Sequence, residues 1–247
     1  MSPFNLIIGG QKLSIQINIM TERMGLAFDL EGPVVDFERK GHHAAHLKCA
    51  KVIGLTLTIE EAIQKIPHFL GGPDEAIAED LYALGNKNLK PLEILAMKQK
   101  LFAGWLEKQK VLPTRAGIFD FLKEAKRREI PMAIGSATEK KKVYDYVARA
   151  GLQEFFPPRM IVTGEDVTHT KPAPDIYLEC AKRVGVSPKN LVVFEDSGRG
   201  VQAGCAAGAY VIGMPVYYVP EVIQKLKDAG ARKVYRGWGE VKLTSFS

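Results

Sequence analysis

The sequence predicts an α/β protein, a doubly wound parallel sheet with an inserted helical module. Short apolar segments alternate with longer segments in which apolar residues recur at three-and-four spacing. Between about residues 38 and 108 this alternation stops, and helical patterns follow one another without a clear core strand. Repeated strand, helix and strand segments imply right-handed crossovers between parallel strands.

The first 23 residues precede this alternation and have a pattern of their own. The apolar Leu6–Ile8 segment is followed by Gly9-Gly10, and then by apolar residues that alternate with polar ones, at Ile15, Ile17 and Ile19. This pattern indicates a β-hairpin. We therefore expect an N-terminal extension at 1–23, an α/β core formed by 24–37 and 109–247, and a helical cap domain at 38–108.

Four apolar runs bounded by Gly, Pro or charged residues predict strands buried on both faces. They are Leu26–Leu30, Met132–Gly135, Ile161–Gly164 and Leu191–Phe194. The core helices are predicted from apolar positions at helical spacing. These positions are Ile118, Phe121, Leu122 and Ala125; Val143, Tyr146, Val147 and Ala150; and Tyr177, Cys180, Ala181 and Val184. Gly151 is expected to end the second of these helices in a left-handed conformation.

Helical patterns also fill the predicted insert, for example at Gly41–Val52 and Glu60–Ile66. Its ends lie near Val35–Phe37 and Lys110–Pro113, so the chain crosses between core and insert twice and the crossings should form a hinge. Gly71-Gly72-Pro73 predicts a tight turn that could face the active site.

Composition narrows the classes of function. The 247 residues, 46% of them hydrophobic, suffice for a substantial core. The net charge of +6 is scattered, which indicates solvated helix faces first and attraction of an anionic substrate second, and which disfavours nucleic acid. Three cysteines without CxxC spacing, at positions 49, 180 and 205, indicate a reducing and therefore cytoplasmic location. No segment approaches 18 consecutive apolar residues, so we expect no membrane partner.

Polar residues stand where the predicted strands end or the following helices begin. Asp29, Ser136, Lys171 and the pair Glu195-Asp196 occupy these positions, at the edge where open α/β sheets bind ligands. Each alone has an ordinary alternative as a turn, a helix cap or a surface charge. Together they supply a nucleophile, a hydroxyl, a cation and metal-binding carboxylates, which phosphoryl transfer to a carboxylate requires.

Four segments resemble the motifs of the haloacid dehalogenase superfamily, in order and in spacing. They are Asp29-Leu30-Glu31-Gly32, Ile134-Gly135-Ser136-Ala137-Thr138, Lys171-Pro172-Ala173-Pro174-Asp175, and Phe194-Glu195-Asp196-Ser197 with Gly200 and Gly204. The resemblance covers residues 25 to about 215 and is closest to the β-phosphoglucomutase and phosphoglycolate phosphatase branch. It implies a Rossmann-like core with a helical cap.

The resemblance also implies roles for individual residues. Asp29 would be the nucleophile and form an aspartyl-phosphate, and Glu31 would be the general acid and base. Ser136, Ala137 and Lys171 would bind the phosphate. The metal site would comprise Asp29, Glu31 through its backbone carbonyl, Glu195 and Asp196, and oxygen ligands suit Mg²⁺.

Two residues depart from the usual first motif. Glu31 stands where Asp is common, so its carboxylate lies one methylene further out, and a misplacement on the order of 1 Å can cost ~10²-fold in rate. Enolase-phosphatases carry Glu at this position and remain active. Pro33 replaces a common Thr, which removes a hydroxyl and an N–H from this loop.

The insert contributes weaker candidates for function. His42, His43 and His46 share a predicted helix, but a third metal ligand at convincing spacing is missing. We interpret them as a solvated helix of the cap, part of which faces the substrate. Candidates for substrate contacts from the cap are Lys48, Lys51 and Lys87.

The sequence thus predicts Mg²⁺-dependent hydrolysis of a small phosphate monoester, such as a sugar phosphate or a phosphoglycolate-like compound. One alternative is a phosphosugar mutase of the β-phosphoglucomutase kind. Another, of a different class, is a non-catalytic protein that keeps the fold to bind a phosphorylated ligand. The expected partner is a small phosphorylated metabolite, and the expected oligomeric state is a monomer or a homodimer.

Overall fold

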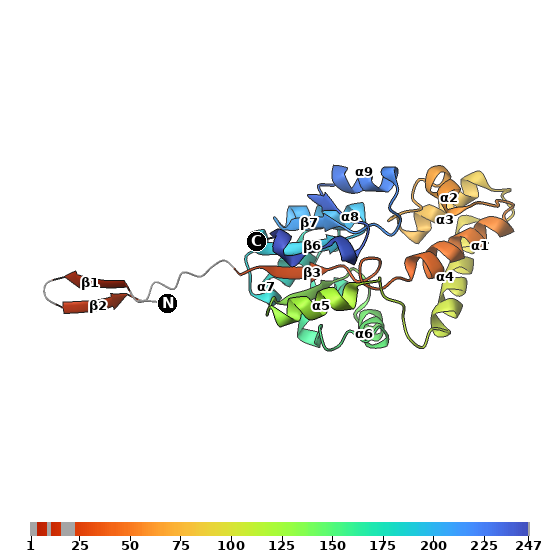
Figure 1. Cartoon of the computed structure of the whole chain (residues 1–247). Helices are drawn as coiled ribbons and strands as arrows, with labels where there is room; N and C mark the ends of the chain where they lie inside the picture. Colours follow the sequence, from red (N-terminus) through yellow and green to blue (C-terminus); the bar gives the residue numbers. More distant parts are fainter. Residues whose placement is uncertain (1–3, 9–10, 16–22, 247) are drawn as a thin grey trace.

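The structure is a computed structural model and describes residues 4–8, 11–15 and 23–246. Its centre is a six-stranded sheet in the order β5-β4-β3-β6-β7-β8, in which every neighbouring pair is parallel (Figure 1). The strands are β3 (Gly25–Phe28), β4 (Met132–Gly135), β5 (Ile161–Val162), β6 (Leu191–Glu195), β7 (Tyr210–Gly213) and β8 (Lys233–Val234). The predicted doubly wound α/β fold is confirmed.

Helices cover both faces of this sheet. They are α5 (Ile118–Arg127), α6 (Lys140–Arg149), α7 (Asp175–Val184), α8 (Gly198–Ala206) and α9 (Pro220–Asp228). Successive side chains of a strand point to opposite faces, so Leu26 and Phe28 pack with α5 and α6, whereas Ala27 packs with α7. The apolar positions predicted for the core helices are buried as expected.

An aromatic cluster fills the face covered by α5. Phe28 stacks on Phe194 with 5.1 Å between ring centroids, and Trp238 lies 4.7 Å from Phe121. The Trp238 indole also donates a hydrogen bond of 2.8 Å to the carbonyl of Pro33, so this cluster is tied to the loop that follows β3. The packing therefore fixes the loop that carries Asp29 and Glu31.

A second group of helices stands beyond the end of the sheet to which β3 points (Figure 1). It comprises the π-helix η1 (Glu38–His43), α1 (Ala44–Val52), α2 (Ile59–Lys65), α3 (Asp74–Leu84) and α4 (Pro91–Glu107). Helices α1 to α4 pack around a hydrophobic cluster of their own. The two chain crossings lie side by side, since the Asp36 amide donates to the carbonyl of Pro113 at 2.8 Å. Val35 and Thr114 also form an antiparallel bridge.

At the N-terminus, β1 (Phe4–Ile8) and β2 (Gln11–Ile15) pair antiparallel, with Leu6 opposite Leu13. Ile17 and Ile19, which the alternating pattern also included, lie outside the described residues.

Two strands, β7 and β8, were not predicted from the sequence. Tyr210–Gly213 is an apolar run of the same length as β4 and could have been predicted, whereas β8 has only two, partly exposed residues at the sheet edge and no apolar run. The expected end of the second core helix is correct, because Gly151 follows α6 with φ of +70°.

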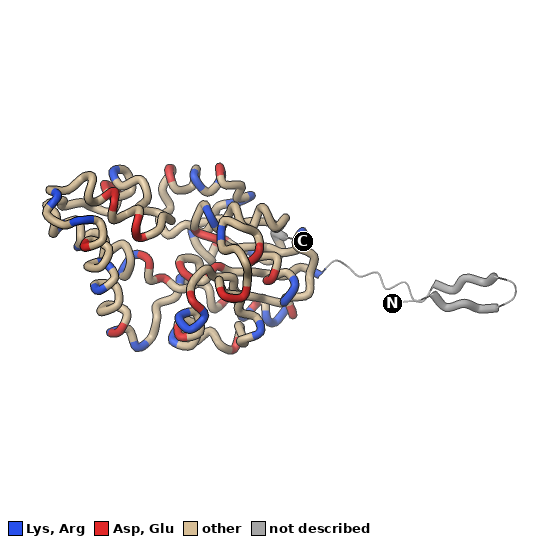
Figure 2. The backbone as a smooth tube through the Cα atoms, turned by 180° about the vertical axis from the view of Figure 1, so that it is seen from behind, with Lys and Arg blue, Asp and Glu red and all other residues tan. Residues whose placement is uncertain are grey.

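Lysines and arginines are interspersed with acidic residues along the described backbone (Figure 2). Among the described residues, no helix is long and apolar enough to cross a membrane.

Candidate active site

Lys171 joins two of the predicted acidic residues. Asp29 directly follows β3, Glu195 ends β6, and the Lys171 ammonium donates hydrogen bonds to Asp29 Oδ1 at 2.5 Å and to Glu195 Oε1 at 2.6 Å. A third bond, of 2.9 Å, goes to the carbonyl of Gly135 at the end of β4. Parallel strands end at one edge of the sheet, so a single buried cation reaches all three strand ends.

The charges at this edge strongly affect one another. Burial raises the pKa of Asp29 to about 7, although Lys171 beside it lowers this pKa. Burial disfavours the charged form of Lys171, but Asp29 and Glu195 more than compensate and raise the pKa of its ammonium above the ordinary value. Lys171 therefore stays protonated and supplies permanent positive charge next to Asp29.

Glu195 is held by hydrogen bonds on both oxygens. Lys171 and the Tyr177 hydroxyl, at 2.7 Å, donate to Oε1, while the Asp196 amide and the Ser197 hydroxyl donate to Oε2, each at 3.1 Å. The carboxylate leaves no room for a side chain at Gly200, where an added Cβ would lie 1.8 Å from Oε1. Glu195 thus organises the turn between β6 and α8.

Three carboxylates gather in front of the sheet. Oxygens of Asp29, Glu195 and Asp196 all lie within 4.8 Å of one another. Burial, and next the nearby Asp29 and Glu195, raise the pKa of Asp196 well above its ordinary value. Three carboxylates against the single ammonium of Lys171 leave an excess of negative charge, and the donors are all oxygens. The residues therefore fit a divalent cation such as Mg²⁺.

Gly32 allows the first loop to approach this cluster. Its φ is +103°, and an added Cβ would lie 2.1 Å from Asp196 Oδ2. Both the left-handed conformation and the close approach require glycine here.

Glu31 points away from the carboxylate cluster toward a different partner. The Thr138 hydroxyl donates a 2.5 Å hydrogen bond to Glu31 Oε1, and the Thr138 amide donates to Ser136 Oγ at 3.1 Å. Burial raises the pKa of Glu31, and the bond from Thr138 partly offsets this rise. Because 107 residues separate Thr138 from Glu31 in the chain, no local pattern of the sequence predicts this bond.

One pocket collects the residues predicted for catalysis and phosphate binding. Its volume is about 410 Å³, and Asp29, Glu31, Ser136, Ala137 and Lys171 all line it. Gly71 and Gly72, in the turn that the sequence indicated could face the active site, also line this pocket. We call this space the phosphate pocket.

The family model described as haloacid dehalogenase-like hydrolase matches residues 26–214, which contain all four motifs. The chain belongs to this family. The predicted membership, and with it the expectation of a hydrolase, is thereby confirmed.

Individual relatives of this hydrolase extend the comparison. A fructose-1-phosphate phosphatase of Escherichia coli is 32% identical over 185 residues, which are 74% of this chain and 92% of the relative. The crystal structure of a family hydrolase from Deinococcus radiodurans with bound phosphate and sodium has a TM-score of 0.74 at 25% identity, covering 91% of this chain and 95% of that one. A putative β-phosphoglucomutase from Thermotoga maritima shares the fold, with a TM-score of 0.65 at 24% identity over 86% of this chain and 94% of that one.

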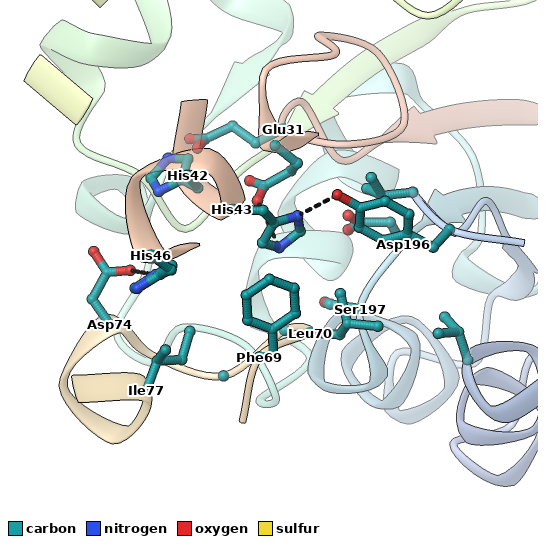
Figure 3. Close-up of a pocket in the computed structure, with 16 residues that line it drawn as sticks. Glu31, His42, His43, His46, Phe69, Leu70, Asp74, Ile77, Asp196 and Ser197 are labelled. Atoms are coloured by element: carbon teal, nitrogen blue, oxygen red, sulfur yellow. Dashed lines mark hydrogen bonds and ion pairs between the residues drawn. The ribbon is translucent and has the colours of Figure 1, made fainter. Parts of the chain in front are cut away.

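A second cavity, of about 330 Å³, adjoins the phosphate pocket of the hydrolase. Figure 3 shows it between the chain segment with His42, His43 and His46 on one side and Asp196 and Ser197 on the other. Glu31 and Ser197 line both spaces. We call this space the alcohol cavity.

The expectation of a solvated histidine helix was wrong. His43 and His46 are only 5% and 2% exposed, because the side of η1 and α1 that carries them packs against the core and α3. His43 Nδ1 lies 3.1 Å from the Tyr217 hydroxyl, and His46 Nε2 lies 3.1 Å from Asp74 Oδ1. Burial lowers the pKa of His43 to about 3, so this side chain is neutral near pH 7.

A buried lysine missed in the sequence stands behind this cavity. Lys98 of α4 is 1% exposed and donates hydrogen bonds to His42 Nδ1, at 2.7 Å, and to Asp74 Oδ2. Its burial depends on the packing of α4 against α1 and α3, which no local pattern in the sequence predicts. The lysines predicted to contact the substrate from the cap line neither the phosphate pocket nor the alcohol cavity; they are Lys48, Lys51 and Lys87. Lys87 instead donates hydrogen bonds to backbone carbonyls at the end of α3.

Proposed function

We propose that the protein hydrolyses small phosphate monoesters, with sugar phosphates as the substrate class, through an aspartyl-phosphate on Asp29. The observation that carries this proposal is the shared pocket of Asp29, Glu31, Ser136 and Lys171, which come from three distant segments of the chain. These residues combine a nucleophile, an acid and base, a hydroxyl and a cation around one space large enough for a phosphate group.

The phosphatase assignment is supported by the family and by the names of relatives. A relative that is 32% identical over most of both chains is named for phosphatase activity on fructose 1-phosphate. We extend the substrate class of that relative to this chain as part of the proposal.

In the first step, the hydrogen bond from Lys171 holds one carboxylate oxygen of Asp29 and orients the other for attack on phosphorus. The bond between phosphorus and the leaving alcohol breaks as the new Asp29–phosphorus bond forms. The raised pKa of Glu31 favours a protonated carboxyl, which donates its proton to the leaving oxygen. Ser136 and Lys171 bind the phosphoryl oxygens during transfer.

In the second step, the roles of Glu31 reverse. Its carboxylate, formed by loss of the first proton, accepts a proton from water, and the water oxygen attacks phosphorus. The Asp29–phosphorus bond breaks, which releases inorganic phosphate and restores the Asp29 carboxylate. The hydrogen bond from Thr138 keeps the longer Glu31 side chain in place through both steps.

We assign Asp29, Asp196 and the backbone carbonyl of Glu31 as the residues that would hold Mg²⁺. When bound, the ion neutralises charge between Asp29 and the phosphoryl oxygens. Glu195, whose oxygens already accept bonds from Lys171, Tyr177 and the following turn, serves as a positioning residue beside the ion.

We further propose that residues 38–108 form the cap domain of a core made by 24–37 and 109–247. The separate hydrophobic cluster of α1 to α4 and the paired crossings at Asp36 and Pro113 support this division. A cytoplasmic location is part of the same proposal, since all three cysteines are free thiols.

A phosphate-release assay tests the proposed function. Purified protein should release phosphate from fructose 1-phosphate when Mg²⁺ is present and not when EDTA replaces it, while the Asp29→Asn variant should be inactive. An Asp120→Asn variant, in which the exchanged carboxylate lies exposed on α5, is the matched control and should keep full activity. Activity of Asp29→Asn equal to that of the wild type would refute the proposal.

A further inference from the structure

We infer that the alcohol cavity accepts an uncharged, hydroxyl-bearing alcohol and rejects a second phosphate group, so that the substrates are monophosphates of small sugars or polyols. This inference rests on the proposed function, because it concerns the part of the ester that leaves when Asp29 attacks. It also separates hydrolysis of monophosphates from the mutase alternative, which needs a bisphosphate.

The cavity is continuous with the place of reaction. Glu31, Gly71, Gly72 and Ser197 line both the alcohol cavity and the phosphate pocket. Its volume of about 330 Å³ is at the lower end of the range for small-molecule sites, which suits an alcohol of a few carbon atoms.

The wall of the cavity offers no cation for a second phosphate. Among the described residues that line it, none is lysine or arginine, whereas four carry carboxyl groups. These four are Glu31, Glu38, Asp74 and Asp196. Phosphate groups are bound in proteins mainly by arginine, lysine and free backbone amides, so a second phosphate would be buried without a positive partner.

The cations nearest to the cavity are engaged elsewhere. The Lys98 ammonium lies between Asp74 and His42, and the Arg39 guanidinium donates to the carbonyl of Val216. Arg115 donates to a set of backbone carbonyls. Arg199 lines the phosphate pocket, where its guanidinium donates to the carbonyl of Lys171 at 2.6 Å. Arg199 and Lys225 also line a further space that shares Ser197 with the alcohol cavity, but neither lines the alcohol cavity itself.

The histidines of the wall act as neutral hydrogen-bonding groups. His42 Nδ1 accepts a hydrogen bond from the Lys98 ammonium, so this nitrogen carries no proton and the ring is neutral. His46 donates through Nε2 to Asp74, which leaves Nδ1 as an acceptor, and this buried atom has no hydrogen-bond partner among the described residues.

The remaining wall suits a carbon skeleton with hydroxyl groups. Phe69, Ile77 and Val216 form apolar surface, while Ser197 and Tyr217 contribute hydroxyls (Figure 3 labels Phe69, Ile77 and Ser197). Substrate hydroxyls can donate to the carboxylates of the wall, whereas a phosphate dianion has no proton to donate to them. The surroundings therefore select against charge as well as size.

The test compares two substrates that differ by one phosphate. Wild-type protein with Mg²⁺ should have a kcat/KM for fructose 1-phosphate that is ~100-fold or more above that for fructose 1,6-bisphosphate, the order of discrimination expected from one unfavourable charge contact. Calorimetric titration of the Asp29→Asn variant with both compounds should show the same preference in binding. Equal kcat/KM values for the pair would overturn the inference and leave the proposed function intact.

Hydrolysis and binding together distinguish failure of the inference from failure of the proposed function. If the wild type hydrolyses neither compound and the Asp29→Asn variant still binds the monophosphate preferentially, the proposed function fails and the inference holds. Equal binding of both compounds overturns the inference whether or not hydrolysis occurs.

A change of charge tests the cause of the preference. Asp74→Asn removes the carboxylate that neutralises Lys98, so the released ammonium should raise the relative kcat/KM for the bisphosphate by on the order of tenfold. Glu79→Gln removes an equal charge from the exposed face of the same helix and should leave the ratio unchanged. Should Asp74→Asn fail to fold, Leu70→Lys places a cation on the half-buried rim of the cavity, with Leu70→Gln as its control. An unchanged ratio in the variant that folds would overturn the inference.

Discussion

The hydrogen bond between Thr138 and Glu31 provides a direct test of how the longer carboxylate works. Thr138→Val removes the hydroxyl that donates to Glu31 Oε1 at 2.5 Å and nearly preserves the shape of the side chain. If this bond positions Glu31 for proton transfer, its loss should slow the chemical step and leave substrate binding nearly unchanged.

The size of the effect follows from the kind of bond. Hydrogen bonds to charged groups contribute ~1.5 to 3 kcal/mol, and each ~1.4 kcal/mol of barrier corresponds to a factor of ten in rate. We therefore expect kcat to fall by about 10- to 100-fold, with KM within about twofold of the wild type. Thr168→Val, an exposed threonine outside the pocket, is the control and should have no effect.

The pH profile provides a second readout. Burial raises the pKa of Glu31, and the bond from Thr138 lowers it in part, so removal of the hydroxyl should raise this pKa further. The limb of the kcat/KM profile that reports Glu31 should move to higher pH in Thr138→Val. A purely structural role of Thr138 would lower the amount of folded protein without this displacement.

A double-mutant cycle can refute the reasoning. Glu31→Ala should itself cost ~10² to 10⁴-fold in turnover, as expected for loss of a general acid and base. If Thr138 acts through Glu31, then Thr138→Val in the Glu31→Ala background should cause no further loss. Effects that multiply in the double variant would show that Thr138 acts on the phosphate or on the fold and not on Glu31.

Three further predictions concern stability and charge. Lys171→Met should abolish turnover. Because it leaves the buried Glu195 carboxylate without its cation, it should also lower the free energy of unfolding by ~3 to 5 kcal/mol in urea titrations. Stability equal to that of the wild type would contradict the buried ion pair. Trp238→Ala should destabilise the core by ~3 to 5 kcal/mol and Trp238→Phe by far less, again by urea unfolding. Burial raises the pKa of Asp166, but hydrogen bonds from Lys140 and Thr163 outweigh burial and lower this pKa to about 2. The Asp166 carboxylate therefore stabilises the fold above the unfolded-state pKa near 4. This stabilisation is lost as the pH falls toward 2. Asp166→Asn should thus be less stable by about 2 kcal/mol at pH 7, a difference that narrows below pH 4 and that would contradict the assignment if it were independent of pH.

The core of the fold was predictable because its signals are local. Strand β4 has the predicted bounds, and the first strand differs only in its limits, Gly25–Phe28 in place of Leu26–Leu30. Apolar runs flanked by Gly and Pro specify strands that are buried on both faces. The edge strand β8 was missed because a two-residue, partly exposed strand needs no apolar pattern.

The candidate site was predictable where residues follow strands and less so where the insert contributes. Asp29, Ser136 and Asp196 directly follow parallel strands, whose topology brings their ends to one edge, whereas the position of Lys171 depends on the loop before α7. The polar wall of the alcohol cavity depends on how η1, α1, α3 and α4 pack, which no local pattern specifies. Burial of His43 and Lys98 in particular arises from contacts between helices far apart in the chain.

The direct identification of a phosphorylated Asp29 tests the central claim most closely. Wild-type protein with Mg²⁺ and excess fructose 1-phosphate should be quenched with acid within one turnover and digested, and its peptides analysed by mass spectrometry. We predict that the peptide containing Asp29 carries one added phosphoryl group, and that the corresponding peptide of Asp29→Asn does not. A wild-type enzyme that turns over substrate while phosphate is found on another residue would contradict the assignment of Asp29 as the nucleophile.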